Sequence, residues 1–346
     1  IVMNAFKGVT QVLNEYDANL KTLMEQTKND LSVAVEDINT KLDQLSELNS
    51  SIAHEIFSNN DYDGVNYGPN DLLDQRNVIL DDLSRYGDVQ VTDLEDGKIQ
   101  VKINGKVVVD ASGASYTNDK LNIGSDGVTL TWNSNNQNAN LGAGAIRGFT
   151  DMLTGADPIN AGIPYYQNKM DNFAQTLADV FNNKIHADDP DFPDKYKFLL
   201  QGGVDGKVTA GNISISDQWA DDVSYIIRKQ NPDGELDNQD ILDMKAAFEQ
   251  DFNFGGEYTG TFSEFITSVT NTLGSGIKTN SARMSASLAI AESADSERMG
   301  VSGVSLNEEG ISMMTYNKAY QALGRLMTTM DEQLDMIINK MGIVGR

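Results

Sequence analysis

The sequence has 346 residues, more than one compact core usually holds, which predicts two or three structural units. Its 51 acidic and 26 basic residues give a net charge of −25, which argues against a nucleic acid or an anionic membrane as partner. The chain has no cysteine, which excludes disulfides, a thiolate nucleophile and a Cys-ligated metal. The sequence contains neither an apolar run of transmembrane length nor a recognisable signal peptide at its start.

Residues 1–58 have the pattern of one long helix. Apolar residues recur mostly at steps of three and four from Phe6 to Ile56, with the polar Asn49 between Leu45 and Ile52, and neither Pro nor Gly occurs between Gly8 and Gly64. At about 1.5 Å per residue such a helix is roughly 87 Å long, longer than a single globular core needs. A rod is therefore predicted. Because the first residue is not an initiator Met and already lies in helical sequence, we expect a fragment that lacks its true N-terminus.

The predicted rod segment extends to residue 186 through shorter elements. A polar loop at 59–70 is followed by an amphipathic helix over 71–86. The apolar period then changes to two, which predicts β-hairpins at about 88–133, with a turn at Asn104-Gly105. Helical sequence returns near Ala145, and a strong helix runs from 163 to about 185.

Residues 187–255 differ from what precedes them. They hold three of the six prolines and several glycine turns, with a predicted strand at 208–216 and short helices near 221–228 and 240–252. We interpret this part as a small inserted mixed region. The helical period then resumes, and residues 256–303 are predicted to be the returning helix of the rod.

Residues 304–346 are predicted to form an axial coiled-coil helix. Ser305 and Glu308 have the spacing of a capping box at its start. Large apolar residues then alternate at steps of three and four, the pattern of a coiled coil, which needs another helix to cover it. We expect an assembly surface, the alternative being an ordinary core helix of a bundle. These residues are the terminal seam: Met313, Tyr316, Tyr320, Leu323, Met327, Met330, Leu334, Ile337 and Met341.

These segments together predict a mainly α protein with a β-hairpin-rich part, of the α+β class. The first and last thirds of the chain are both largely long helices, and two such apolar faces cover each other best if the chain folds back on itself. We therefore expect a long antiparallel helical rod formed by the N- and C-terminal segments, with an inserted β and loop region.

Motifs that would carry chemistry are incomplete. His54-Glu55 begins a zinc-protease motif, but Ser58 stands where the second His is needed. Residues 59–70 partly match a calcium loop, but the twelfth position is Asn70 where a bidentate Glu is required, so a solvated turn is favoured and calcium is left open. No phosphate loop or dinucleotide fingerprint follows a strand. We predict no catalytic, cofactor-binding or metal-binding residue, no cofactor and no enzymatic activity.

Two motifs resemble those of bacterial flagellar axial proteins. Residues 303–309 (GVSLNEE) and 316–322 (YNKAYQA) resemble the C-terminal signature of that group. Residues 69–76 (PNDLLDQR) resemble the signature of the hook-associated protein 1 family, the first of the hook–filament junction proteins. Asn307 stands where the family usually has Asp, and the family's N-terminal axial helix is missing from this sequence. That helix is the partner which the resemblance implies for the terminal seam.

The resemblance implies a structural subunit of the bacterial flagellum that forms the junction between hook and filament by self-association and packing of its terminal helices. It implies type III export without a cleaved signal peptide, and so an extracellular position in the flagellum. The implied partners are copies of the chain in a ring, the hook protein, the next hook-associated junction protein, and a cytoplasmic export chaperone that binds the C-terminal region. Neither nucleic acid nor membrane is among them.

Three other interpretations stay open. One is another flagellar axial subunit, of hook or filament type, against which residues 69–76 argue. A second is a non-flagellar secreted coiled-coil adhesin or fibre protein, which would be a stable trimer in solution. The third is an enzyme with a coiled-coil stalk, which needs a converging polar site that the sequence does not reveal.

Overall fold

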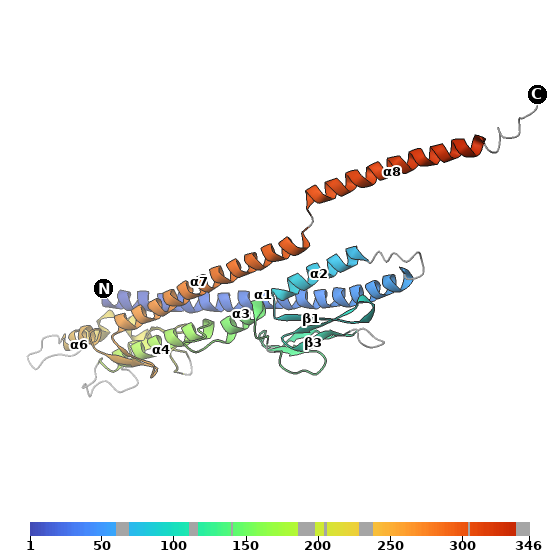
Figure 1. Cartoon of the computed structure of the whole chain (residues 1–346). Coiled ribbons are helices and arrows are strands. Elements are labelled where there is room, and N and C mark those ends of the chain that lie inside the picture. Colours follow the sequence, from blue (N-terminus) through green and yellow to red (C-terminus); the bar gives the residue numbers. More distant parts are fainter. Residues whose placement is uncertain are drawn as a thin grey trace, which may run out of the picture. The chain divides into compact units, whose positions relative to one another are not determined.

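Helices dominate the structure, and the strands form small antiparallel sheets, so the predicted mainly α, α+β class is confirmed. The chain divides into two compact units, Ile1–Thr270 and Asn271–Arg346. Figure 1 labels the main helices and two of the strands. The computed structural model describes residues 1–59, 69–110, 117–139, 141–185, 198–203, 206–227, 238–303 and 305–336.

Helix α1 (Val2–Asn59) is a single element, as the three-four periodicity of its apolar residues predicts. Two hydrophobic clusters lie against it. One surrounds its N-terminal end and includes Phe6 and Leu13, and the other covers its later turns from Leu31 to Leu45. In the second cluster, the residues of α1 at three-four spacing are buried, so the apolar face of this part of the helix is covered by other elements of the same unit.

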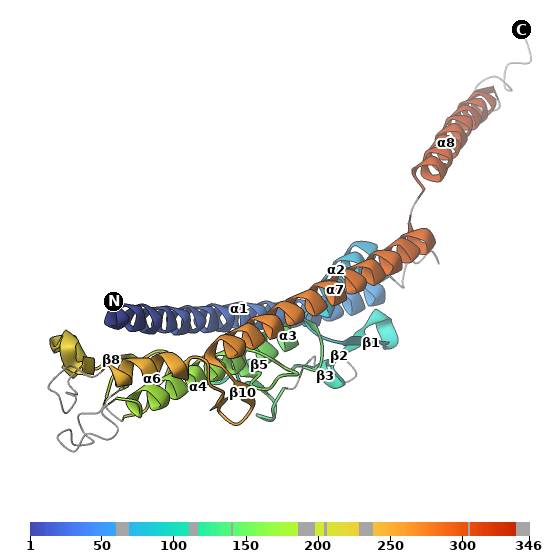
Figure 2. The same ribbon diagram turned by 90° about the vertical axis from the view of Figure 1, so that its left-hand side faces the viewer.

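Three helices return along α1 in the antiparallel direction, side by side with it in both views (Figures 1 and 2). They are α2 (Asn70–Ser84), α3 (Gly144–Thr154) and α4 (Ile163–Asn182). As the chain advances through them, its contacts step back toward the start of α1. The successive contacts are Lys41 Nζ–Asp82 Oδ2 at 3.2 Å, Thr27 Oγ1–Met152 Sδ at 3.9 Å and the rings of Phe6 and Phe181 at 4.9 Å. The antiparallel partners of α1 within this unit therefore come from residues 70–182, and pairing of α1 with the C-terminal helices stays a prediction.

A four-stranded antiparallel sheet packs on the later turns of α1. Its order is β1 (Val89–Asp93), β2 (Ile99–Ile103), β3 (Lys106–Asp110) and β4 (Thr117–Asn118), with the short helix η1 (Glu95–Gly97) between the first two strands. Asn104 and Gly105 turn from β2 to β3 with φ of 49° and 81°, the left-handed pair of a type I′ hairpin. A second hairpin joins β5 (Leu121–Ile123) to β6 (Leu130–Trp132). The hairpins predicted for 88–133 are confirmed.

Asparagines on α1 fasten these strands to the helix. Asn49 is fully buried, accepts a hydrogen bond from the Ile99 N–H at 3.1 Å and donates one to the Ile99 carbonyl at 2.9 Å. Asn39 makes the same pair of bonds with the backbone of Leu121, at 2.8 and 2.9 Å. A side-chain amide presents a donor and an acceptor together, so each asparagine satisfies both backbone groups of one strand residue, as a neighbouring strand would.

The remaining elements of the first unit pack around the N-terminal end of α1 and α4. Their shared core contains Phe6, Phe181, Trp219, Phe254 and Phe265. The polypeptide predicted to be an insert thus contributes to the same core as the rod helices. These elements are β7 (Leu200–Gln201), β8 (Ser214–Ile215), α5 (Asp217–Asp221), η3 (Val223–Ile227), α6 (Gln239–Ala247), β9 (Phe252–Phe254) and β10 (Tyr258–Gly260).

The strand predicted over 208–216 is wrong in extent, because only Ser214–Ile215 is a strand. The residues before it form a turn that is held by side chains of neighbouring helices. Asn14 on α1 donates to the carbonyls of Ala210 and Ile213, each at 3.0 Å. These long-range bonds replace the ladder that the apolar alternation suggested.

Helix α7 (Phe262–Ser302) begins with a complete capping box. The Thr261 N–H donates to Glu264 Oε2 at 3.0 Å, and the Glu264 N–H donates to Thr261 Oγ1 at 3.2 Å. Phe262 and Phe265 are buried in the aromatic core of the first unit, whereas α7 is exposed beyond Thr272. The second unit also contains α8 (Leu306–Asp335). Among the residues that the structure describes, no helix is both long and apolar enough to span a membrane.

Candidate assembly surface

Helix α8 starts where the capping residues predict. Ser305 has an extended backbone and its hydroxyl accepts a hydrogen bond from the Glu308 N–H at 3.4 Å. Glu308 and Glu309 place negative charge in the first turn, where the free N–H groups of a helix favour it. The helix then continues without interruption through Gly310 and Gly324, each with open space around it.

Every described residue of the terminal seam is exposed. The fractions range from 53% at Leu334 to 78% at Tyr320, and α8 has no buried residue among those described. Fully burying a large apolar side chain contributes about 1.5–3 kcal/mol, so covering seven of them would contribute on the order of 10–20 kcal/mol before entropic costs. The described seam residues are Met313, Tyr316, Tyr320, Leu323, Met327, Met330 and Leu334, while Ile337 and Met341 lie outside the described residues.

Further apolar side chains of α8 lie off the terminal seam. Ile311, Met314, Leu326 and Met336 are all more than half exposed. At 3.6 residues per turn, Ile311, Met314 and the C-cap residue Met336 fall on other sides of the helix than the seam, whereas Leu326 flanks the edge of the seam. These residues do not follow the three-four spacing of the terminal seam, and they were not predicted as part of the assembly surface. Counting all large apolar residues on the helix surface would have shown that the apolar area is wider than one coiled-coil stripe.

The exposure continues on the part of α7 in the second unit. Ile277, Met284, Leu288 and Met299 are each more than half exposed. Isolated exposed apolar residues are ordinary, but a series of them along two helices is typical of a surface that another chain covers.

The motif at 69–76 has a structural role in the first unit. Arg76 is buried, and its Nη1 donates to the Gly97 carbonyl at 2.6 Å, which ties α2 to η1. Burial lowers the pKa of the Arg76 guanidinium, and the charge of Asp93 opposes that shift. Gly97 has φ of 69°, a conformation that residues with a side chain rarely adopt, and a Cβ there would lie 2.5 Å from Ile56 Cδ1 on α1, so a larger residue would be strained and would have to displace that methyl group. Arg76 of the motif thus holds η1 beside α2, and Gly97 of η1 lies against α1.

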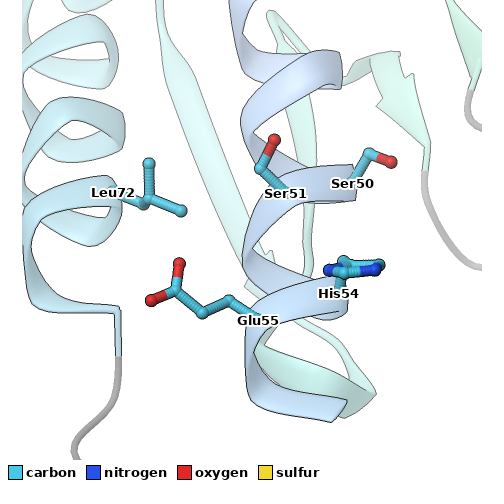
Figure 3. A pocket seen from close by; sticks show the side chains of 5 residues that line it. All are labelled: Ser50, Ser51, His54, Glu55 and Leu72. Carbon is cyan, nitrogen blue, oxygen red and sulfur yellow. The ribbon is translucent and has the colours of Figure 1, made fainter. Parts of the chain in front are cut away.

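The incomplete zinc-protease motif lies in a hollow of about 500 Å³ between the end of α1 and the start of α2. Ser50, Ser51, His54, Glu55 and Leu72 line it. Figure 3 shows Glu55 on the side of α1 that faces Leu72 and His54 on another side, so the imidazole and the carboxylate do not converge. Within the described ranges no cluster of three or more His, Cys, Asp or Glu is placed to hold a metal. The calcium-loop residues 60–68 lie outside the described residues.

Two families of flagellar proteins match this chain. The family described as flagellar hook-associated protein FlgK helical domain matches residues 1–194, and the family described as flagellar basal body rod FlgEFG protein C-terminal matches residues 296–340. Flagellar hook-associated protein 1 of Bacillus subtilis (strain 168) is 26% identical over 382 residues, which cover 100% of this chain and 72% of that protein. The resemblance stated from residues 69–76 and 303–322 is thereby confirmed. Because the first match spans more than half of its length, the chain belongs to the FlgK family of flagellar hook-associated proteins, structural components of the bacterial flagellum.

Proposed function

We propose that this chain is the subunit that joins the flagellar hook to the filament, and that it assembles by packing α8 against helices of neighbouring subunits. The observation that carries the proposal is the exposure of every described residue of the terminal seam on a capped, continuous helix. The buried stripe of α1 supports the same view. On α1 the apolar residues at three-four spacing are buried within the first unit, whereas on α8 the described residues with the same spacing are exposed.

Assembly in this proposal is driven by removal of the seam from water. The apolar area offers on the order of 10–20 kcal/mol, from which the loss of translational freedom and the ordering of side chains subtract a large part. The net charge of −25 favours solubility of a free subunit that exposes such a surface. Binding is then coupled to the ordering of α8, whose two glycines each weaken the isolated helix by about 1 kcal/mol.

The proposed partners follow from the position at the hook. They are further copies of this chain in a ring, the hook protein, and the next hook-associated junction protein. An exposed seam is an aggregation hazard inside the cell, which is why we include a cytoplasmic export chaperone that covers the C-terminal region. Export without a cleaved signal peptide would then bring the subunit to its extracellular place in the flagellum. A structural family implies a non-enzymatic role.

A second candidate is a different axial subunit, because the match over residues 296–340 is to a rod-protein C-terminal family. The match over residues 1–194 to the hook-associated family favours the junction role over this candidate.

Electron microscopy of hook ends tests the proposal. Cells that lack the intact protein are expected to carry hooks without filaments, and its return should restore the filaments. The variant Leu323→Asp should fail to restore them, because it places a charge in the terminal seam. The matched control Gln321→Asp adds the same side chain within one turn, on the polar side of α8, and should restore filaments. Normal filaments with Leu323→Asp would contradict the proposed role of the seam.

A further inference from the structure

The sulfur atoms of this chain are distributed unevenly between core and surface. The sequence has no cysteine, so all its sulfur is in 13 methionines. Four of them lie on α8 and a fifth, Met336, is its C-cap residue, and these five are 56–71% exposed. In the first unit Met170 and Met244 are only 6% and 3% exposed, Met3 and Met24 are half-buried, and Met152 is 36% exposed. Both tryptophans, the other readily oxidised side chains, are buried as well. The five are Met313, Met314, Met327, Met330 and Met336.

We propose that the methionines of α8 are a peroxide-sensitive modification site of the free subunit, and that their oxidation prevents assembly while leaving the first unit folded. This inference rests on the proposed function of the terminal seam. The oxidant is hydrogen peroxide. The thioether sulfur attacks one peroxide oxygen and the O–O bond breaks. An S=O bond forms while the proton of the attacked oxygen passes to the departing oxygen, which leaves as water, so sulfur loses the two electrons that the peroxide gains.

Access decides which sulfur reacts. A peroxide molecule reaches the exposed methionines of α8 directly, but reaches Met170 or Met244 only if the core of the first unit opens. Oxidation at low peroxide concentration is therefore expected first at the methionines of α8 and α7, which are more than half exposed, then at the less exposed Met152, and last at Met170 and Met244.

Three of the oxidised positions, Met313, Met327 and Met330, lie in the terminal seam. A sulfoxide replaces a flexible apolar side chain by a polar one, so a neighbouring helix would have to bury S=O groups without a hydrogen-bond donor. Met314 and Met336 are also more than half exposed but lie off the terminal seam, so their oxidation leaves the seam apolar. Sulfoxide reductases reverse the reaction, with one enzyme for each epimer. The site would thus respond reversibly to oxidants before assembly and be shielded afterwards.

The first experiment treats the purified full-length protein with increasing hydrogen peroxide and maps oxygen by peptide mass spectrometry. Addition of one oxygen, about 16 Da per methionine, is expected on α8 before Met170 or Met244 react. The near-ultraviolet circular dichroism of the buried aromatic residues should stay unchanged. Oxidation of Met170 at the same rate as Met327 would overturn the proposed selectivity.

The second experiment measures binding of the same protein to isolated hooks by immunogold electron microscopy. Oxidised protein should lose hook binding, and treatment with both sulfoxide reductases should restore it. Leucine fills nearly the same volume as methionine and does not oxidise, so two matched variants separate the positions. Both carry Met341→Leu, which removes the seam methionine outside the described residues.

The seam variant (M313L, M327L and M330L) should bind hooks before and after peroxide, whereas the off-seam variant (M314L and M336L) should lose binding after peroxide. Oxidised wild-type protein that binds as well as untreated protein, or equal behaviour of the two variants, would overturn the inference. The proposed function fails separately, if untreated Leu323→Asp binds hooks normally.

Discussion

Replacement of Asn49 by leucine is the most direct test of how the sheet is held on α1. The side chain is fully buried and makes two hydrogen bonds to the backbone of Ile99, which is itself buried. Leucine removes both bonds and leaves one N–H and one carbonyl without a partner. Each unsatisfied buried group costs about 1–3 kcal/mol, and the better helix propensity of leucine returns at most about 0.5 kcal/mol. We therefore expect Asn49→Leu to lower the free energy of unfolding by about 2–5 kcal/mol.

Urea denaturation followed by far-ultraviolet circular dichroism measures this change, from the shift of the midpoint and the slope. Asn19→Leu is the matched control, because Asn19 lies on the same helix and is exposed. It should change the free energy of unfolding by less than about 0.5 kcal/mol. Equal stability of Asn49→Leu and the control would refute the view that this asparagine substitutes for a neighbouring strand.

Three other predictions concern local features. Gly97→Ala should destabilise the first unit by about 1–3 kcal/mol in thermal melts, because φ is positive and a Cβ would push the Ile56 side chain aside. Gly105→Ala, with similar φ but open space, should cost less, and the reverse order would contradict the steric argument. A hydroxyl and two backbone N–H groups lower the pKa of Asp126 to about 2. Because this folded-state pKa is depressed, its stabilisation is present above the ordinary Asp pKa near 3.8 and is lost as the pH falls through about 2. An NMR titration midpoint near 3.8 would disprove it. Lys169 is buried and pairs with the exposed Glu257 at 2.6 Å. Glu257→Gln, which leaves that ammonium unpaired, should therefore lower the free energy of unfolding by about 1–3 kcal/mol, whereas Lys169→Met should be nearly neutral. Equal losses in urea denaturation would argue against this.

Local signals in the sequence were sufficient for the long helices and the main hairpin. The helix over residues 1–58 follows from a three-four apolar period with no Pro or Gly after Gly8, and the turn at Asn104-Gly105 follows from residues that accept positive φ. The start of α8 follows from the capping residue Ser305. Each of these features is decided by residues close together in the chain.

Features that depend on distant partners were not predicted. Asn49 appeared only as a polar interruption of an apolar stripe, because its partner is 50 residues away. The turn before Ser214 alternates like a strand, but its backbone bonds go to Asn14, nearly 200 residues earlier. Which elements lie along α1 is likewise set by tertiary packing, since several amphipathic helices of this chain have a face that would fit.

Hydrogen exchange of residues 306–335 tests the central claim, that α8 exposes its seam in order to pack against neighbours. It compares the free full-length protein with the same protein bound to hooks. The expected result is rapid exchange of α8 in the free protein and strong protection after binding, with the amides of α1 between Leu31 and Leu45 protected in both. Slow exchange of α8 in the free monomer, or no gain of protection on hooks, would contradict the account.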